Sequence, residues 1–148
     1  MQLKLNPVQS VPGGNRFCGP AVVSSILNVD TKTSAFLLRH RNNRRQITGT
    51  APHWIANVLK DCGIAMRMVE QYPNKAQAPT LNQWLGKTLR ERLDTGNLYL
   101  LAAGNHWQLI QDMRYVCGII KEVVSVDHPK VKRRARVTKV YLIQREEA

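Results

Sequence analysis

One cysteine in the sequence combines a residue type and a setting suited to nucleophilic chemistry. Cys18 stands in Phe17-Cys18-Gly19-Pro20, and the small apolar residues that follow predict a buried helix over about 18–28. The N–H groups at a helix N-terminus favour a thiolate over a thiol and can also bind an oxyanion. We therefore expect Cys18 to be a nucleophile, with Gly19 leaving room for a substrate carbonyl.

A histidine much later in the chain is the matching base. His106 follows the turn residues Gly104-Asn105 and opens an apolar run that predicts a strand over about 107–111. A histidine at the exposed end of a strand can reach across to a helix N-terminus and act as general base and later as general acid. Trp107 would shield the pair from water, so Gly104 and Trp107 join Gly19 as predicted substrate-binding residues.

The imidazole of such a pair needs an acceptor that fixes its orientation. Asp127 ends an apolar run over about 122–127, and successive antiparallel strands could bring it beside the start of the His106 strand. Asp112 is the competitor, but it would sit at the opposite end of the same strand. The sequence therefore favours Asp127 as the third catalytic residue.

The remaining cysteines and histidines indicate no second site. Cys62 and Cys117 are each followed by glycine in apolar surroundings, which is typical of buried structural cysteines. Three cysteines with no close pair argue against a disulfide framework and suit a reducing, cytoplasmic compartment. His and Cys residues show no metal-ligand spacing and no phosphate-binding glycine loop is present, so we expect no metal and no cofactor.

The charge balance predicts anionic partners. Lys and Arg number 22 against 10 Asp and Glu, a net charge of +12. Such a field attracts nucleic acid or an acidic protein surface, although basic loops can also serve only solubility. The candidate anion-binding residues fall in two clusters: Arg39, Arg41, Arg44 and Arg45, then Lys132, Arg133, Arg134 and Arg136.

Helices come first in the predicted order of elements and strands second. Predicted helices cover about 18–28, 34–40, 52–62 and 80–93, with a short strand over 64–69. Predicted strands cover 98–102, 107–111, 115–119, 122–127 and 137–143. This layout predicts a single α+β domain over 1–148, with a helical part of about 18–93 and an antiparallel sheet of about 97–144. No apolar run is long enough for a membrane span.

Taken in order, these motifs resemble the papain-like cysteine peptidase superfamily, and most closely its bacteriocin (double-glycine) leader-peptidase branch. The resemblance runs from about residue 9 to 129. It rests on Cys18-Gly19-Pro20, on Thr48-Gly49-Thr50 ahead of a helix, on His106-Trp107 and on an aspartate before a proline. It implies a papain-like fold and cleavage of a peptide or isopeptide bond through a thioester on Cys18.

One departure concerns the oxyanion site. Family members usually carry a glutamine about six residues before the cysteine, and Pro12 occupies that position here. Asn15 and Gln9 are the amides available to replace it. With a protein or peptide as the expected substrate, acyl transfer remains an alternative to hydrolysis.

A second alternative is an inactive papain-like domain that binds nucleic acid or an acidic protein through its basic clusters. The compact, basic chain carries no nucleotide-binding segment, so we expect a stand-alone bacterial or phage enzyme rather than a complete exporter. The sequence gives no indication of its oligomeric state.

Overall fold

The computed structural model describes residues 3–92 and 96–146 of the chain. Its helices are α1 (Cys18–Leu27), α2 (Thr31–Arg41), α3 (Pro52–Asp61) and α4 (Leu81–Arg92), with a 3₁₀ helix η1 (Lys75–Gln77). Its strands are β1 (Ile64–Gln71), β2 (Leu98–Ala103), β3 (His106–Gln111), β4 (Arg114–Cys117), β5 (Val124–Ser125) and β6 (Val137–Arg145). The predicted α+β class is confirmed, while the expected last residue of the fourth helix, residue 93, lies outside the described residues.

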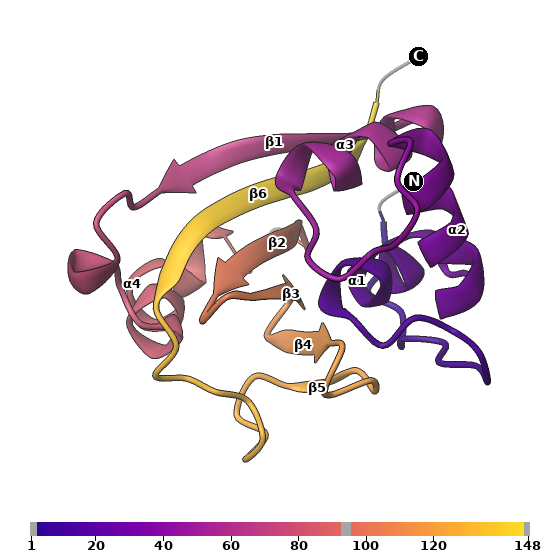
Figure 1. Ribbon diagram of the computed structural model, residues 1–148. Helices are drawn as coiled ribbons and strands as arrows, with labels where there is room; N and C mark the ends of the chain where they lie inside the picture. The colour runs from indigo at the N-terminus through magenta and orange to yellow at the C-terminus, as the bar shows by residue number, and fades with distance from the viewer. Residues whose placement is uncertain (1–2, 93–95, 147–148) are drawn as a thin grey trace.

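All six strands form one antiparallel sheet in the order β1-β6-β2-β3-β4-β5. The strands β2, β3, β4 and β5 follow one another as a meander, whereas β6 returns from the end of the chain to lie between β1 and β2 (Figure 1). This return places the long β6 strand inside the sheet, next to the edge strand β1.

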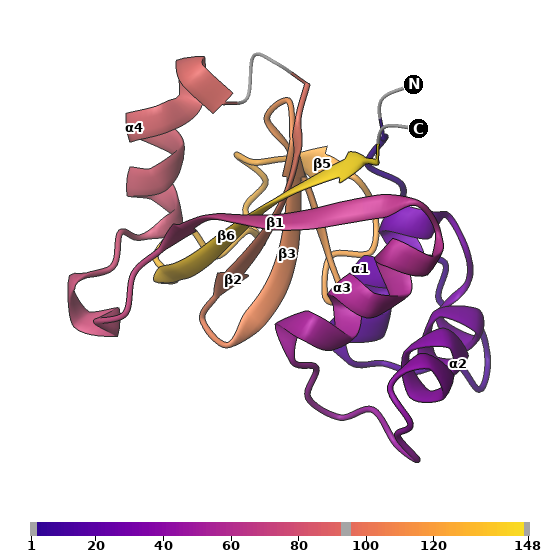
Figure 2. The same ribbon diagram turned by 90° about the horizontal axis from the view of Figure 1, so that it is seen from above.

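The sheet has a hydrophobic cluster on each face. The helices α1, α2 and α3 lie on one side and α4 lies on the other (Figure 2). On the first side, residues such as Val22 and Ile55 pack with Leu100 and Leu109. On the second side, Trp84 of α4 packs with strand residues including Leu101. Side chains alternate between the two faces along each strand, so the central strands contribute to both clusters.

Helix α1 is buried almost throughout, as its composition predicts. Its residues from Gly19 to Ile26 are all buried, and Val22 and Val23 are fully inaccessible. Pro20 lies in the first turn, where a missing N–H costs no hydrogen bond. The helix ends at Asn28, which adopts a left-handed conformation with φ 56°. A helix packed on all sides holds its first residue, Cys18, in a fixed position.

The last predicted strand of the meander is much shorter than its apolar run suggests. The run over 122–127 forms only the two-residue strand β5, which pairs with Arg114 and Tyr115 of β4. Its backbone then turns, and the N–H of Val126 donates to the carbonyl of Met113. Within the described part of the chain, no helix is both long enough and apolar enough to cross a membrane.

Candidate active site

Cys18 is the first residue of α1 and is only partly exposed. The N-cap residue, Phe17, makes no side-chain cap hydrogen bond, and the first turn contains no acidic residue. The N–H groups of this turn are therefore left for other acceptors, and the positive end of the helix dipole favours the thiolate of Cys18.

The end of the β3–β4 pairing lets α1 approach the sheet. The last β3–β4 pair is Gln108–Cys117, so Trp107 has no partner in β4. Gly118 lies against Cys18 instead: a Cβ added at Gly118 would stand 3.4 Å from Cys18 Cα. The backbone N–H of Trp107 therefore has no partner in β4 and lies near Cys18, where it favours the thiolate.

A tight hairpin turn positions His106. Gly104 and Asn105 both have positive φ, 59° and 57°, which is the geometry of a two-residue type I′ turn. The turn makes Ala103 and His106 a directly opposed pair, so His106 is the first residue of β3. The imidazole lies close to both Cys18 and Cys117, two cysteines from different elements.

The contact between Cys18 and His106 changes the acidity of both groups. Burial raises the pKa of the Cys18 thiol, but the neighbouring His106 imidazole and the Trp107 N–H outweigh this effect, so the pKa lies below its ordinary value. Burial also lowers the pKa of His106, but contacts with Cys117 and Cys18 outweigh this effect and raise the pKa to about 9. Both shifts favour a thiolate next to an imidazolium.

Cys117 is the functional candidate that sequence reasoning missed. It is buried, at 2% exposure, but it contacts His106 and is not an inert core cysteine. Burial raises the pKa of this thiol, and hydrogen bonds from His106, the Ile120 N–H (3.3 Å from the sulfur) and Tyr115 lower it to about 7.

The register of the β3–β4 hairpin could have predicted that Cys117 lies near His106. The tight turn at Asp112 and Met113 sets residue 117 opposite residue 108, on the face that His106 shares with Gln108.

The structure places Asp127, the predicted third residue, away from His106. Along β3 the chain runs away from His106, β4 brings it back, and β5 carries it away again. Two antiparallel steps therefore place Asp127 across β4 from the far end of β3, where it is exposed and its N–H donates to Ser125 Oγ. Asp112 lies at the same far end, so neither aspartate is next to His106.

The two predicted oxyanion amides are occupied elsewhere. Gln9 lies beside the C-terminal end of α1, where its Nε2 donates to Asn28 Oδ1 at 2.7 Å. It is therefore separated from Cys18 by the length of the helix. Asn15 is near the site, but its Nδ2 donates to the Ile47 carbonyl at 3.0 Å and its Oδ1 accepts from the Phe17 N–H. Asn15 thus fixes the backbone just before α1 by linking Phe17 to the loop at Ile47.

A cavity of about 450 Å³ opens over Cys18 and His106. Its walls include the loop residues Thr48, Gly49 and Thr50 together with Gly104. Gly19 packs so closely beneath Thr50 that an added Cβ would overlap the threonine Oγ1. Trp107 lines the same cavity, and its Nε1 donates to the Thr50 carbonyl at 3.0 Å. The tryptophan therefore anchors the loop that faces the cysteine.

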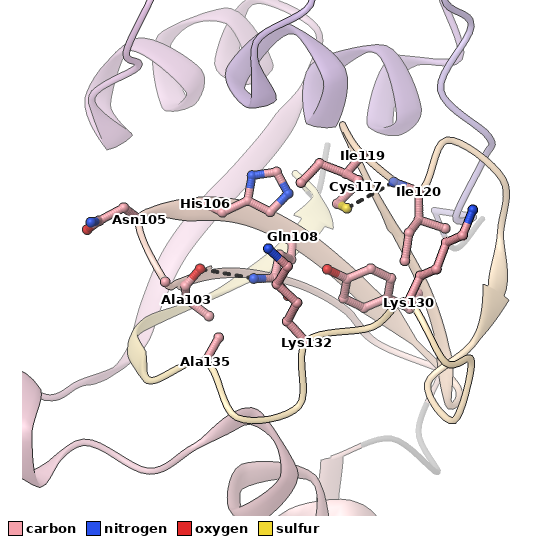
Figure 3. A pocket seen from close by; sticks show the side chains of 12 residues that line it. Ala103, Asn105, His106, Gln108, Cys117, Ile119, Ile120, Lys130, Lys132 and Ala135 are labelled. Carbon is pink, nitrogen blue, oxygen red and sulfur yellow. Dashed lines mark hydrogen bonds between the residues drawn. The ribbon is translucent and has the colours of Figure 1, made fainter.

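A second cavity, of about 270 Å³, is also lined by His106 (Figure 3). It shares Gly104, Asn105 and His106 with the first cavity. Its inner wall includes Cys117 and Gln108. No described residue meets His106 Nε2 in full hydrogen-bond geometry, although that atom is buried. His106 therefore lines both cavities, and its buried Nε2 is left without a hydrogen-bond partner among the described residues.

The first basic cluster is largely engaged in local contacts. Arg41 forms a 2.7 Å ion pair with Asp61, and the Arg44 guanidinium lies 4.6 Å from the centre of the Trp54 ring. Arg39 lines a separate shallow cavity near the end of α2, and Arg45 is exposed in the loop that follows.

The second basic cluster lies in the loop between β5 and β6. Arg133 donates to the carbonyls of Val126 and His128, and Arg136 donates to that of Ala78 at 2.7 Å. Lys132 lines the 270 Å³ cavity beside His106, while Arg133 and Arg134 line a neighbouring one. Of this cluster, Lys132 is thus the residue placed next to the candidate catalytic pair. Among the described residues, no group of three or more His, Cys, Asp or Glu could hold a metal ion.

Comparison with solved structures identifies the fold. The peptidase domain of Streptococcus ComA, a bi-functional ABC transporter involved in a quorum-sensing pathway, superposes with a TM-score of 0.53 at 17% sequence identity. The match covers 97% of this chain and 100% of that domain. No protein-family model and no curated protein matches the sequence. The chain therefore has the papain-like α+β fold of that peptidase domain, as the order of its motifs predicted.

Proposed function

We propose that the protein is a thiol hydrolase that cleaves a peptide or isopeptide bond through a thioester on Cys18. The observation that carries this proposal is the contact between His106 and a thiol at the N-terminus of a buried helix, with a cavity above both. The likeness to a peptidase domain supports it at the level of the fold.

The proposed reaction has two halves. The Cys18 thiolate attacks the carbonyl carbon, and the resulting oxyanion is stabilised by N–H groups at the start of α1. When the C–N bond breaks, His106 donates its proton to the leaving amine and a thioester remains. A water molecule then attacks the thioester as His106 takes its proton, which releases the acid and restores the thiolate.

We assign Cys117 the position that an orienting carboxylate usually holds. Its sulfur lies close to His106, within a pocket that also supplies the Ile120 N–H and the Tyr115 hydroxyl. A thiolate there would favour the imidazolium, as a carboxylate does. Both roles require reduced thiols, so a reducing, cytoplasmic setting is part of the proposal.

The reactivity of the three cysteines tests the proposal. At neutral pH, limiting iodoacetamide should modify Cys18 faster than Cys62, because a lowered pKa provides more thiolate. Cys62 is an exposed internal control, and Cys117 should react slowly because it is buried. Peptide mapping by mass spectrometry gives all three rates from one sample. If Cys18 reacts no faster than Cys62, the catalytic assignment is wrong.

Replacing Cys117 with serine is expected to narrow the active pH range. The hydroxyl keeps the size of the side chain but does not ionise, so the pKa of His106 should fall from about 9. The alkaline limb of the kcat/KM profile should then move to lower pH, and kcat/KM at neutral pH should fall on the order of tenfold. Cys117→Asp should restore the alkaline limb. An unchanged profile in Cys117→Ser would remove Cys117 from the mechanism.

A further inference from the structure

The 270 Å³ cavity beside His106 contains an unsatisfied acceptor. Gln108 is 3% exposed, and its Nε2 donates to the Ala103 carbonyl at 3.0 Å. Its Oε1 is buried and has no hydrogen-bond partner among the described residues. A buried acceptor left without a donor is destabilising. The cavity therefore favours an occupant with an N–H or O–H donor.

The same cavity has a cationic side. Lys132 extends beside Gln108 toward the His106 ring (Figure 3). Neither Lys132 nor its neighbour Lys130 forms an ion pair with a described residue, and the described residues that line this cavity include no aspartate or glutamate. The adjoining cavity, which shares both lysines, adds Arg133 and Arg134. Positive charge without counterions favours an anionic occupant.

The volume of the cavity and its position next to the cavity above Cys18 indicate what kind of group could occupy it. A water molecule takes up about 30 Å³ in the liquid, so the cavity has room for about nine waters, enough for one polar side chain. It adjoins the cavity above Cys18 and shares the His106 turn with it. A peptide whose scissile bond lies at Cys18 could therefore place a nearby residue here.

We propose that this cavity is a subsite for a carboxylate-bearing residue of the peptide substrate. Lys132 binds the carboxylate, and Gln108 Oε1 accepts a hydrogen bond from the N–H of the same residue. The carboxylate belongs either to an Asp or Glu side chain or to the C-terminus of the peptide. This subsite rests on the proposed peptidase function, because it selects substrates for the cysteine beside it.

Panning of peptides on the full-length Cys18→Ala variant tests the subsite without any need for cleavage. Two random decapeptide libraries, one with free and one with amidated C-termini, are passed over the immobilised variant. Enrichment of Asp or Glu in both libraries assigns a side-chain carboxylate, and enrichment confined to free C-termini assigns the terminal carboxylate. A retained set without either preference, or no retained peptide, overturns the proposal.

Charge reversal then identifies the cation. For a selected peptide, Lys132→Glu in the Cys18→Ala background should weaken binding about tenfold, the effect expected of one close charge pair. Lys60→Glu, which makes the same charge change at an exposed position on α3, is the matched control and should have little effect. Where a side chain is selected, a peptide with Lys in place of that acid should bind the Lys132→Glu variant better than Lys132 protein. Equal weakening by both variants would indicate only a general charge effect and would refute the subsite.

The outcome of panning separates this inference from the proposed function. Selected peptides that bind through Lys132 but are not cleaved by the wild-type protein would leave the subsite standing and contradict the peptidase. Cleavage of peptides regardless of their acidic residues would support the peptidase and contradict the subsite. If oligo(dT) of 20 nucleotides displaces the peptides and itself depends on Lys132, the site is a phosphate site and the peptide subsite is refuted.

Discussion

Replacing Cys18 with alanine is expected to lower kcat/KM for peptide cleavage by at least about 10⁴-fold, since loss of a nucleophile removes the covalent route altogether. The peptide substrate is taken from a library incubated with the wild-type protein, and product formation is followed by mass spectrometry. The methyl group fits where the sulfur was, at the start of a buried helix, so the thermal unfolding midpoint should change little.

Two further variants make this result specific. Cys62→Ala should retain wild-type activity, because Cys62 is exposed just after α3 and lines neither cavity. If Cys18→Ala keeps cleaving and only the Cys18→Ala/Cys117→Ala double variant is inactive, the nucleophile is Cys117. That outcome would overturn the assignment of roles to the two thiols that contact His106.

Replacing His106 with alanine is expected to lower kcat/KM by about 10²–10⁴-fold, the usual contribution of a general acid–base residue. It should also slow alkylation of Cys18 at neutral pH. His106 lowers the pKa of the Cys18 thiol, so without it the pKa rises and less thiolate is present. Measuring both rates on one preparation separates the two effects of the histidine.

The pH dependence of the wild-type protein completes this prediction. The proton that His106 gives to the leaving amine is held below its pKa of about 9 and lost above it. Activity should therefore rise as the Cys18 thiol ionises and fall as the pH passes about 9. In His106→Ala the alkaline fall should disappear. An alkaline fall that survives the substitution would show that another group supplies the proton.

Cys18 and Cys117 both lie close to the His106 imidazole, so their thiolates compete for one positive charge. One imidazolium can neutralise only one thiolate, so the second thiolate must form against the charge of the first. Cys18 faces the larger, open cavity, whereas Cys117 is buried behind the histidine. This difference in access supports the proposal that Cys18 is the thiol that meets the substrate, while Cys117 acts only through His106.

The sequence determined the local part of this arrangement. The apolar run after Cys18 predicts a helix buried on all sides, and the Gly104-Asn105 pair predicts the tight turn that sets His106 at the start of a strand. Both features depend on neighbouring residues, because capping, φ preferences and hydrophobic periodicity are local properties. The order of these elements was sufficient to predict the papain-like fold.

The tertiary structure alone decided which groups stand around His106. Asp127 was the natural choice by residue type, yet two antiparallel steps carry it to the far end of β3. Cys117 reads as a core cysteine in the sequence, yet the register of one hairpin brings it to the imidazole. A shift of one residue in that register would turn Cys117 to the other face of the sheet. Residue types could therefore name the candidate catalytic pair, but the third group beside it depended on strand direction and register, which are set by packing across the whole sheet.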